Sequence, residues 1–211
     1  MLALSLTLVV AVVRFYPRDE SEMRRLLEPP DGCAMPCWQG IRPGITTAGD
    51  AVALLSQHAW GGRIIMTYFD AGKGDGIIAW TWDAHGLEEI ARLHGVRLHV
   101  RDGVVYNISL PPGIPLRDVW LAFGDPSEGE WAIVNRPYTK GYRIQQELSY
   151  GDSGVYVSSR ATCPASLNEL WDAFSTVQLG EPVFHYVLEP VIERDSGYSM
   201  RAMLREQTAC R

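Results

Sequence analysis

The clearest pattern in the chain is a short amphipathic stretch that occurs twice, each time after a Pro-Gly-Ile triplet. The triplets begin at Pro43 and Pro112, and each leads into an apolar stretch, at 51–55 and at 119–123. Their spacing of about seventy residues is typical of a repeated structural unit. Gly124 is the residue type that closes a helix in a left-handed conformation. The pattern predicts two related helices.

Runs of residues typical of β-strands follow each expected helix. They lie at 63–69, 77–82, 96–100 and 104–110 after the first helix, and at 131–134, 142–150, 155–159 and 184–188 after the second. Between two of them, Asp102-Gly103 predicts a two-residue hairpin, because both turn positions need a positive φ. Ser166 with Glu169 three residues later predicts a capped helix over 166–177.

A helix followed by an antiparallel meander, written twice, predicts an α+β fold. We expect two related helix-plus-meander units that share one sheet, with helices on one of its faces. The expected segments are a signal or membrane anchor at 1–16, a charged stalk at 17–32, a first α+β unit at 33–110, a second at 111–190 and a C-terminal tail at 191–211.

The chain begins with an apolar run at 2–13, in which only Ser5 and Thr7 are polar and which Arg14 ends. At about 12 residues it is short for a membrane span and closer to the apolar part of a signal peptide. Basic residues follow the run, against the usual charge rule for such segments. A buried helix or strand is the alternative. We expect an extracytoplasmic protein, membrane-anchored through this segment or secreted.

Composition and charge narrow the possible partners. Hydrophobic residues make up 46% of the chain and charged residues 21%, which indicates a folded core. The net charge of −6 disfavours nucleic acid as a partner, because binding it requires a basic surface.

The four cysteines, Cys33, Cys37, Cys163 and Cys210, lack the spacing of a metal or redox motif. In an exported chain they predict disulfides, for which three connectivities are possible. Cys37 with Cys163 is the expected pair, since both precede helical segments.

The repeated segments resemble a known family. The sequence PGIPLRDVWLAFGDP at 112–126 resembles the signature of small outer-membrane-assembly lipoproteins of the SmpA/OmlA type, and GIRPGIT at 40–46 looks like the start of that signature. Tandem copies of this unit are also similar to the β-lactamase-inhibitor-protein architecture. These resemblances imply a bacterial envelope protein with a concave protein-binding face. Pro30-Asp31-Gly32 before Cys33 departs from the lipid-attachment signal of the lipoproteins.

One motif is compatible with catalysis. Gly-Asp-Ser-Gly at 151–154 is similar to the nucleophile loop of chymotrypsin-like proteases, and His58 precedes it in the chain order of that triad. The same residues also favour a hairpin turn through backbone geometry alone. A serine hydrolase, with Ser153 as nucleophile and His58 as base, is therefore the alternative function. No histidine spacing or phosphate loop predicts a metal or another cofactor.

Two tryptophans are candidates for a binding surface. Trp80 and Trp82 alternate onto one face of the expected strand at 77–82, where they are either core or an exposed anchor pair. The core is favoured because tryptophan is usually buried. If exposed, they would be anchors for a partner, and Tyr142, Tyr150 and Tyr156 would extend the surface. We expect a non-catalytic extracytoplasmic interaction module that binds a protein or envelope partner.

Overall fold

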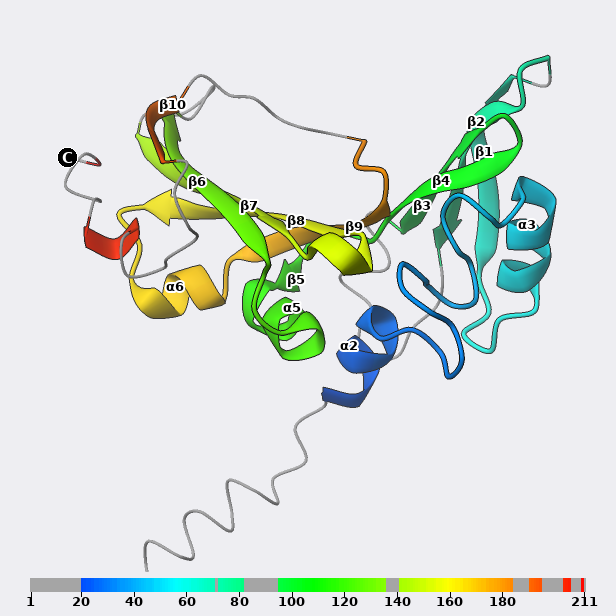
Figure 1. Ribbon diagram of the computed structural model, residues 1–211, viewed down its shortest axis with the longest axis horizontal. Helices are drawn as coiled ribbons and strands as arrows, with labels where there is room; N and C mark the ends of the chain where they lie inside the picture. The colour runs from blue at the N-terminus through cyan, green and yellow to red at the C-terminus, as the bar shows by residue number, and fades with distance from the viewer. Residues whose placement is uncertain are drawn as a thin grey trace, which may run out of the picture.

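Figure 1 shows the computed structural model, which describes residues 20–70, 72–81, 95–135, 141–183, 190–194, 203–205 and 210. The apolar run at 2–13, the strand expected at 184–188 and Trp82 lie outside these residues. The principal helices are α2 (Glu20–Leu27), α3 (Ala48–Ser56), α5 (Leu116–Phe123) and α6 (Leu167–Trp171), with a 3-10 turn, η1, at Gly151–Ser153. None of the helices in this described part of the chain is long and apolar enough to cross a membrane.

The strands form an antiparallel sheet. They are β1 (Arg63–Asp70), β2 (Asp75–Thr81), β3 (Val96–Arg101), β4 (Val104–Ser109), β5 (Ile114–Pro115), β6 (Glu128–Asn135), β7 (Tyr142–Ser149), β8 (Val155–Cys163), β9 (Phe174–Gly180) and β10 (Pro190–Arg194). Their order across the sheet is β1-β2-β3-β4-β9-β8-β7-β6-β10, and β5 also pairs with β9. Two meanders, β1–β4 and β6–β9, therefore meet at the β4–β9 pair, and the predicted α+β class with an antiparallel sheet is confirmed.

Local signals in the sequence set several element boundaries. The Thr47 hydroxyl accepts a hydrogen bond from the Asp50 amide at 3.2 Å and begins α3, and Ser166 and Glu169 form the predicted capping box of α6. Asp102 and Gly103 have φ of 51° and 76° and connect β3 to β4, as predicted for a two-residue hairpin. The glycines of both triplets precede helices.

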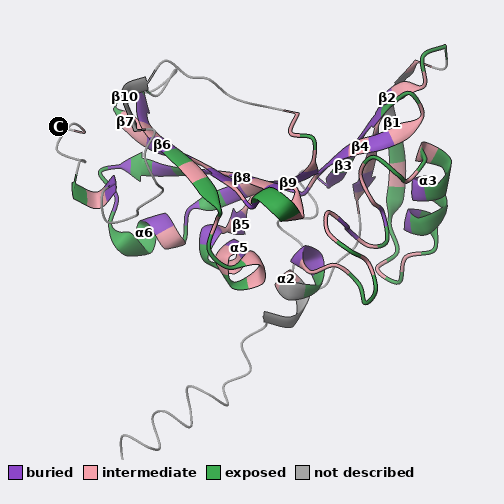
Figure 2. Ribbon diagram, in the orientation of Figure 1, coloured by how far each residue is buried: buried purple, intermediate pink, exposed green. Residues whose placement is uncertain are grey.

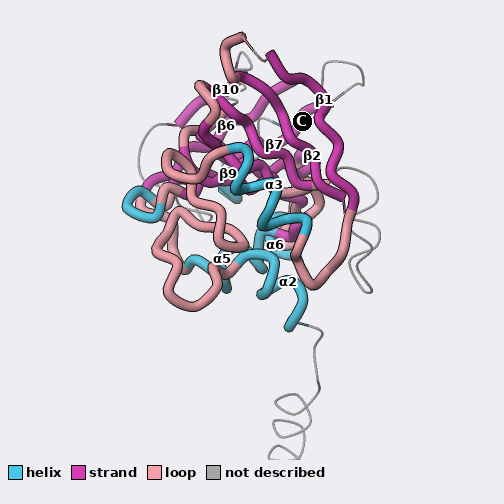
Figure 3. Tube along the Cα trace, turned by 90° about the vertical axis from the view of Figure 1, so that its right-hand side faces the viewer, coloured by secondary structure: helices cyan, strands magenta, loops and turns pink. Residues whose placement is uncertain are grey.

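The core lies between the sheet and the helices. In Figures 1 and 3, α2, α5 and α6 lie on one side of the sheet, and buried residues run through the central strands (Figure 2). Leu26 and Leu27 of α2 are 0% and 1% exposed and belong to this core. The expectation that 17–32 forms a stalk is therefore wrong for α2, which is part of the folded body.

Two other elements differ from the sequence prediction. The helix expected over 166–177 ends at Trp171, and β9 begins at Phe174, because Ser175, Val177 and Leu179 alternate into the core and β9 pairs with both β4 and β8. Residues 191–194, expected in a tail, belong to β10, which pairs with β6.

The disulfides are Cys33–Cys37 and Cys163–Cys210, with Cα–Cα distances of 6.0 and 5.6 Å. The predicted pairing of Cys37 with Cys163 is wrong. Gly154 directly precedes β8, and a Cβ at this position would lie only 3.1 Å from the ring of Pro36. Pro36 directly precedes Cys37, so Cys37 lies near the beginning of β8. Cys163 ends that nine-residue strand, about 27 Å away at the rise of an extended strand, whereas a disulfide needs Cα atoms within about 7 Å.

The two disulfides are expected to differ in their effect on stability. Cys163–Cys210 closes a sequence separation of 47 residues and Cys33–Cys37 one of 4. In the chain-entropy model their loss costs about 4 and about 2 kcal/mol. We expect a Cys163→Ser/Cys210→Ser variant to unfold at a lower denaturant concentration than a Cys33→Ser/Cys37→Ser variant. Equal midpoints, at equal denaturant dependence, would contradict this ranking.

Candidate functional site

One face of the sheet points away from the helices. In β7, β8 and β9, every second residue is buried on the helical side, as Leu148, Val157 and Val177 are. The residues between them point to the other side. Among the described residues no helix lies on that side (Figures 1 and 3). We call it the open sheet face. On these strands it comprises Arg143, Gln145, Glu147, Ser149, Tyr156, Ser158, Arg160, Thr162, Phe174, Thr176 and Gln178. Gln145 and Gln178 are buried within it, at 5% and 6% exposed.

These side chains form rows across the three strands. Gln145 is opposite Arg160 and Arg160 is opposite Phe174, while Glu147, Ser158 and Thr176 form the next row. The Glu147 carboxylate accepts hydrogen bonds from Gln145 Nε2 at 2.9 Å and from the Ser158 hydroxyl at 2.8 Å, both at Oε1. The carboxylate is thereby held in place beside the exposed Arg160.

Phe174 gives this face an apolar element. Its side chain is 69% exposed, and it lies directly opposite Arg160. An aromatic ring beside a guanidinium and a positioned carboxylate offers both apolar and polar contacts to a partner. Aromatic residues and arginine are enriched among the residues that contribute most to binding.

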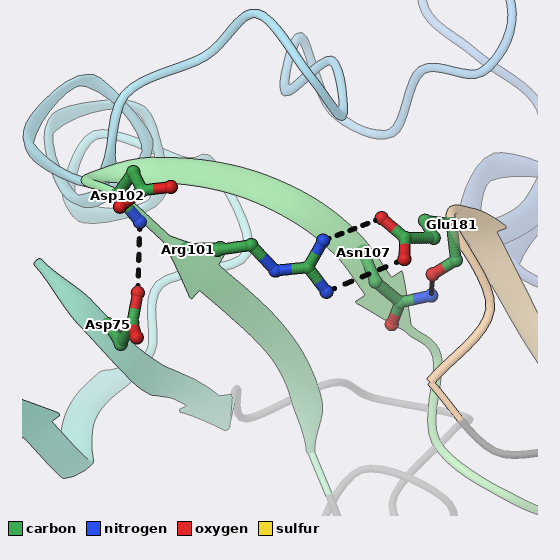
Figure 4. Close-up of polar contacts among 5 residues, drawn as sticks. All are labelled: Asp75, Arg101, Asp102, Asn107 and Glu181. Atoms are coloured by element: carbon green, nitrogen blue, oxygen red, sulfur yellow. Dashed lines mark hydrogen bonds and ion pairs between the residues drawn. The ribbon is translucent and has the colours of Figure 1, made fainter.

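The open sheet face continues across β4 and β3. The Asn107 side-chain amide donates to Gln178 Oε1 at 3.2 Å and to the Glu181 carbonyl at 2.9 Å. Figure 4 shows Arg101 beside Asn107 and Glu181. The Arg101 guanidinium forms an ion pair with the Glu181 carboxylate at 2.8 Å. The Arg101 guanidinium also lies 4.0 Å from the centre of the Tyr106 ring. These contacts attach the segment that follows β9 to the first meander.

His99 lies on β3 opposite Asn107 and is 6% exposed. Burial lowers its pKa below the usual 6.5, and the nearby Arg97 lowers it further. His58, between α3 and β1, has its pKa lowered by burial as well. Burial therefore favours the neutral form of both side chains.

Stability is expected to fall in mild acid because of these histidines. In the folded protein the pKa of each histidine lies below its ordinary value of 6.5. The folded state is therefore fully stabilised by the neutral side chains above pH 6.5. This stabilisation is lost as the pH falls from 6.5 towards the lower pKa of the folded protein. We expect the melting temperature to decrease below about pH 6.5, and to decrease less in His99→Gln. Circular dichroism melts between neutral and mildly acidic pH measure this, and parallel curves for the two proteins would count against it.

Most of the aromatic residues predicted for a binding surface lie elsewhere. Trp80 is 0% exposed and packs against Trp38 and His58, with ring centres 5.8 and 5.5 Å away. Tyr150 is 6% exposed and contacts Phe123 at 5.7 Å. Burial raises its pKa, with a further contribution from Asp125. The core alternative for Trp80 is thus confirmed, and Trp80 and Tyr150 are not surface anchors.

Two predicted tyrosines are half-buried, on opposite sides of the sheet. Tyr142 is opposite Cys163 and packs against the smaller core cluster, whereas Tyr156 belongs to the open sheet face. The sequence prediction missed Arg160, Glu147 and Phe174. Alternation in 155–163 and 142–149 was the available signal for the first two, and Phe174 lay within the expected helix.

The structure does not bring Ser153 and His58 together. The Ser153 hydroxyl donates to the Tyr150 carbonyl at 2.6 Å within η1. His58 Nε2 lies 2.9 Å from Gln39 Oε1, and its Nδ1 accepts from the Trp60 amide at 3.3 Å. The Gly-Asp-Ser-Gly motif is therefore the turn between β7 and β8.

Within the part of the chain that the structure describes, no three His, Cys, Asp or Glu side chains gather in a way that could hold a metal ion. No protein-family model, curated protein or solved structure was found to match this chain.

Proposed function

We propose that this protein is a non-catalytic extracytoplasmic interaction module that binds a protein or envelope partner through the open sheet face. The observation that carries the proposal is the row of Gln145, Arg160 and Phe174, in which an exposed guanidinium and an exposed aromatic ring lie side by side next to a positioned carboxylate. Two disulfides favour an oxidising compartment outside the cytoplasm.

We also infer that the two meanders are related units. The same two backbone hydrogen bonds occur in each half. The donors are the amide of the triplet glycine and the amide of the first helical residue. The acceptors are two carbonyl groups, two residues apart, where the last strand of the meander begins. The bonds are Gly44 to Val105 and Ala48 to Gly103 in one half, and Gly113 to Ser175 and Leu116 to Ala173 in the other. This correspondence supports a tandem architecture with one composite binding face, as the resemblance to the β-lactamase-inhibitor-protein architecture implies.

The shape of the sheet supports the same use. In Figure 1 the two halves of the sheet rise on either side of β9, with β6 and β10 at one end and β1 and β2 at the other. A partner seated on the open sheet face would contact both halves. The polar contacts of Asn107, Gln178 and Glu181 join the halves on this side, so that the face is held in one geometry before a partner binds. Such preorganisation lowers the entropic cost of binding.

Photocrosslinking in the native envelope tests the proposal. A photoreactive residue in place of Phe174 is expected to yield a discrete protein or envelope adduct, and one in place of Leu54, 42% exposed on α3, is not. Adding Arg160→Glu to the Phe174 variant is expected to reduce the adduct at least about tenfold, since removal of a central charged contact costs more than 1.4 kcal/mol. Equal adducts at both positions, or a yield unaffected by Arg160→Glu, would refute the proposed face.

A further inference from the structure

The chain enters the described fold from its helical side. In Figures 1 and 3, α2 lies farther from the sheet than the other helices, and its first turn points away from the sheet. The buried Leu26 and Leu27 attach the other end of α2 to the core. The position of Glu20 thus marks the side on which the preceding residues join the molecule.

The apolar run at 2–13 is close to this point along the chain. Only residues 14–19 separate it from Glu20, and even a fully extended segment of that length reaches no more than about 25 Å. Phe15 and Tyr16 follow the run directly, and aromatic residues favour the membrane–water interface. A membrane that holds the run therefore lies within a short distance of α2 and of α5, which packs against it.

The helices carry exposed apolar side chains on this side. Leu121 of α5 is 74% exposed, and it projects away from the sheet because Leu116 and Val119 occupy the buried side of the same helix. Trp120 contacts Trp171 of α6, with ring centres 5.0 Å apart.

Leu167 lies one turn before Trp171 and is 46% exposed. Trp120, Leu121, Leu167 and Trp171 are called the helical patch below. An ion pair between Arg117 and Asp172 joins α5 to the end of α6, so that the two helices present the patch as one surface.

We propose that the helical patch rests on a lipid bilayer and that the open sheet face points away from it. The inference rests on the extracytoplasmic location in the proposed function and on the sequence-based expectation that residues 1–16 anchor the chain in a membrane. A lipid surface is the occupant that the short tether brings to this side. With the helical layer towards the membrane, the sheet lies between the helices and the open sheet face, so a partner reaches that face from the aqueous side.

Matched photocrosslinkers in the full-length protein test this orientation. Leu121 and Phe174 are similarly exposed, at 74% and 69%, and lie on opposite sides of the sheet. The full chain, with a photoreactive residue at one position or the other, is inserted into vesicles of equal amounts of phosphatidylcholine and phosphatidylglycerol and irradiated. We expect a several-fold higher yield of lipid adduct at 121 than at 174, and adducts again when position 167 carries the label.

The outcomes separate this inference from the proposed function. Vesicle flotation is measured on the same samples, and mass spectrometry checks that residues 1–16 are intact. If the chain stays on the vesicles, three results overturn the orientation alone: equal lipid adducts at 121 and 174, more adduct at 174, or no adduct at either position. Each of them leaves partner capture at Phe174 unaffected. A chain that loses residues 1–16 or washes off the vesicles overturns both membrane anchoring and the orientation.

Discussion

Replacing Gly180 with alanine is expected to lower the free energy of unfolding by about 3 kcal/mol or more, as a sum of backbone strain and overpacking. Gly180 ends β9 with φ of 90°, in the region that favours glycine. A Cβ there would lie 2.5 Å from Cβ of Pro43 and would overlap the carbonyl oxygen of Tyr106. Neither can move freely, because one belongs to a proline ring and the other to the backbone of β4. Chemical denaturation of purified protein measures the loss.

Gly103→Ala is the matched control for this prediction. Gly103 also has a positive φ, 76°, but no atom lies within 4 Å of the position that a Cβ would take. Alanine is therefore expected to cost only the conformational preference, about 1 kcal/mol. The excess loss at Gly180 measures the close approach of β9 to Pro43 and β4, where the two meanders join. Similar losses in the two variants would show that this approach contributes little.

Replacing Trp80 with alanine is expected to cost about 3–5 kcal/mol, the range for large-to-small substitutions of buried aromatic residues. Trp80 is fully buried and contacts Trp38, His58 and Trp60, whose ring centres lie 5.5 to 6.3 Å away. Its removal leaves a cavity between β2 and the loop that carries His58. Thermal unfolding of the variant measures the effect.

The half-buried Trp171 of α6 is the control. Trp171→Ala removes one ring contact, with Trp120, and is expected to cost clearly less than Trp80→Ala, because less of the ring is buried. A Trp80→Ala protein with an unchanged melting temperature would contradict the contribution of Trp80 to the core.

Local chemistry explains which elements could be predicted from the sequence. The hairpin at Asp102-Gly103, the cap of α6 at Ser166 and Glu169, and the helices after the two triplets depend on contacts between residues a few positions apart. A positive φ or a capping oxygen has the same effect in any fold. These features were therefore predictable without knowing which segments would pack together.

The length of α6 shows where this local information ended. A capping box marks where a helix begins but carries no information about where it ends. Residues 174–180 became β9 because Val177 and Leu179 could enter the core and the backbone could pair with β4, about seventy positions earlier in the chain, and with β8. Phe174 consequently appeared on the open sheet face instead of on a helix.

The sequence by itself determined which residues share a face of a strand, because the alternation is a property of extended backbone. On the strand expected at 77–82 it placed Trp80 apart from Ala79, whereas the strand expected at 155–159 ended before Arg160. Only the tertiary structure decided which of these faces the helices cover, because that depends on where α2 and α5 dock. It also decided the cysteine partners, since a disulfide forms between side chains that the fold brings within reach. Burial of Trp80 follows from the packing of Trp38, His58 and Trp60 against it. Arg160 is exposed because, among the described residues, no helix covers its side of the sheet.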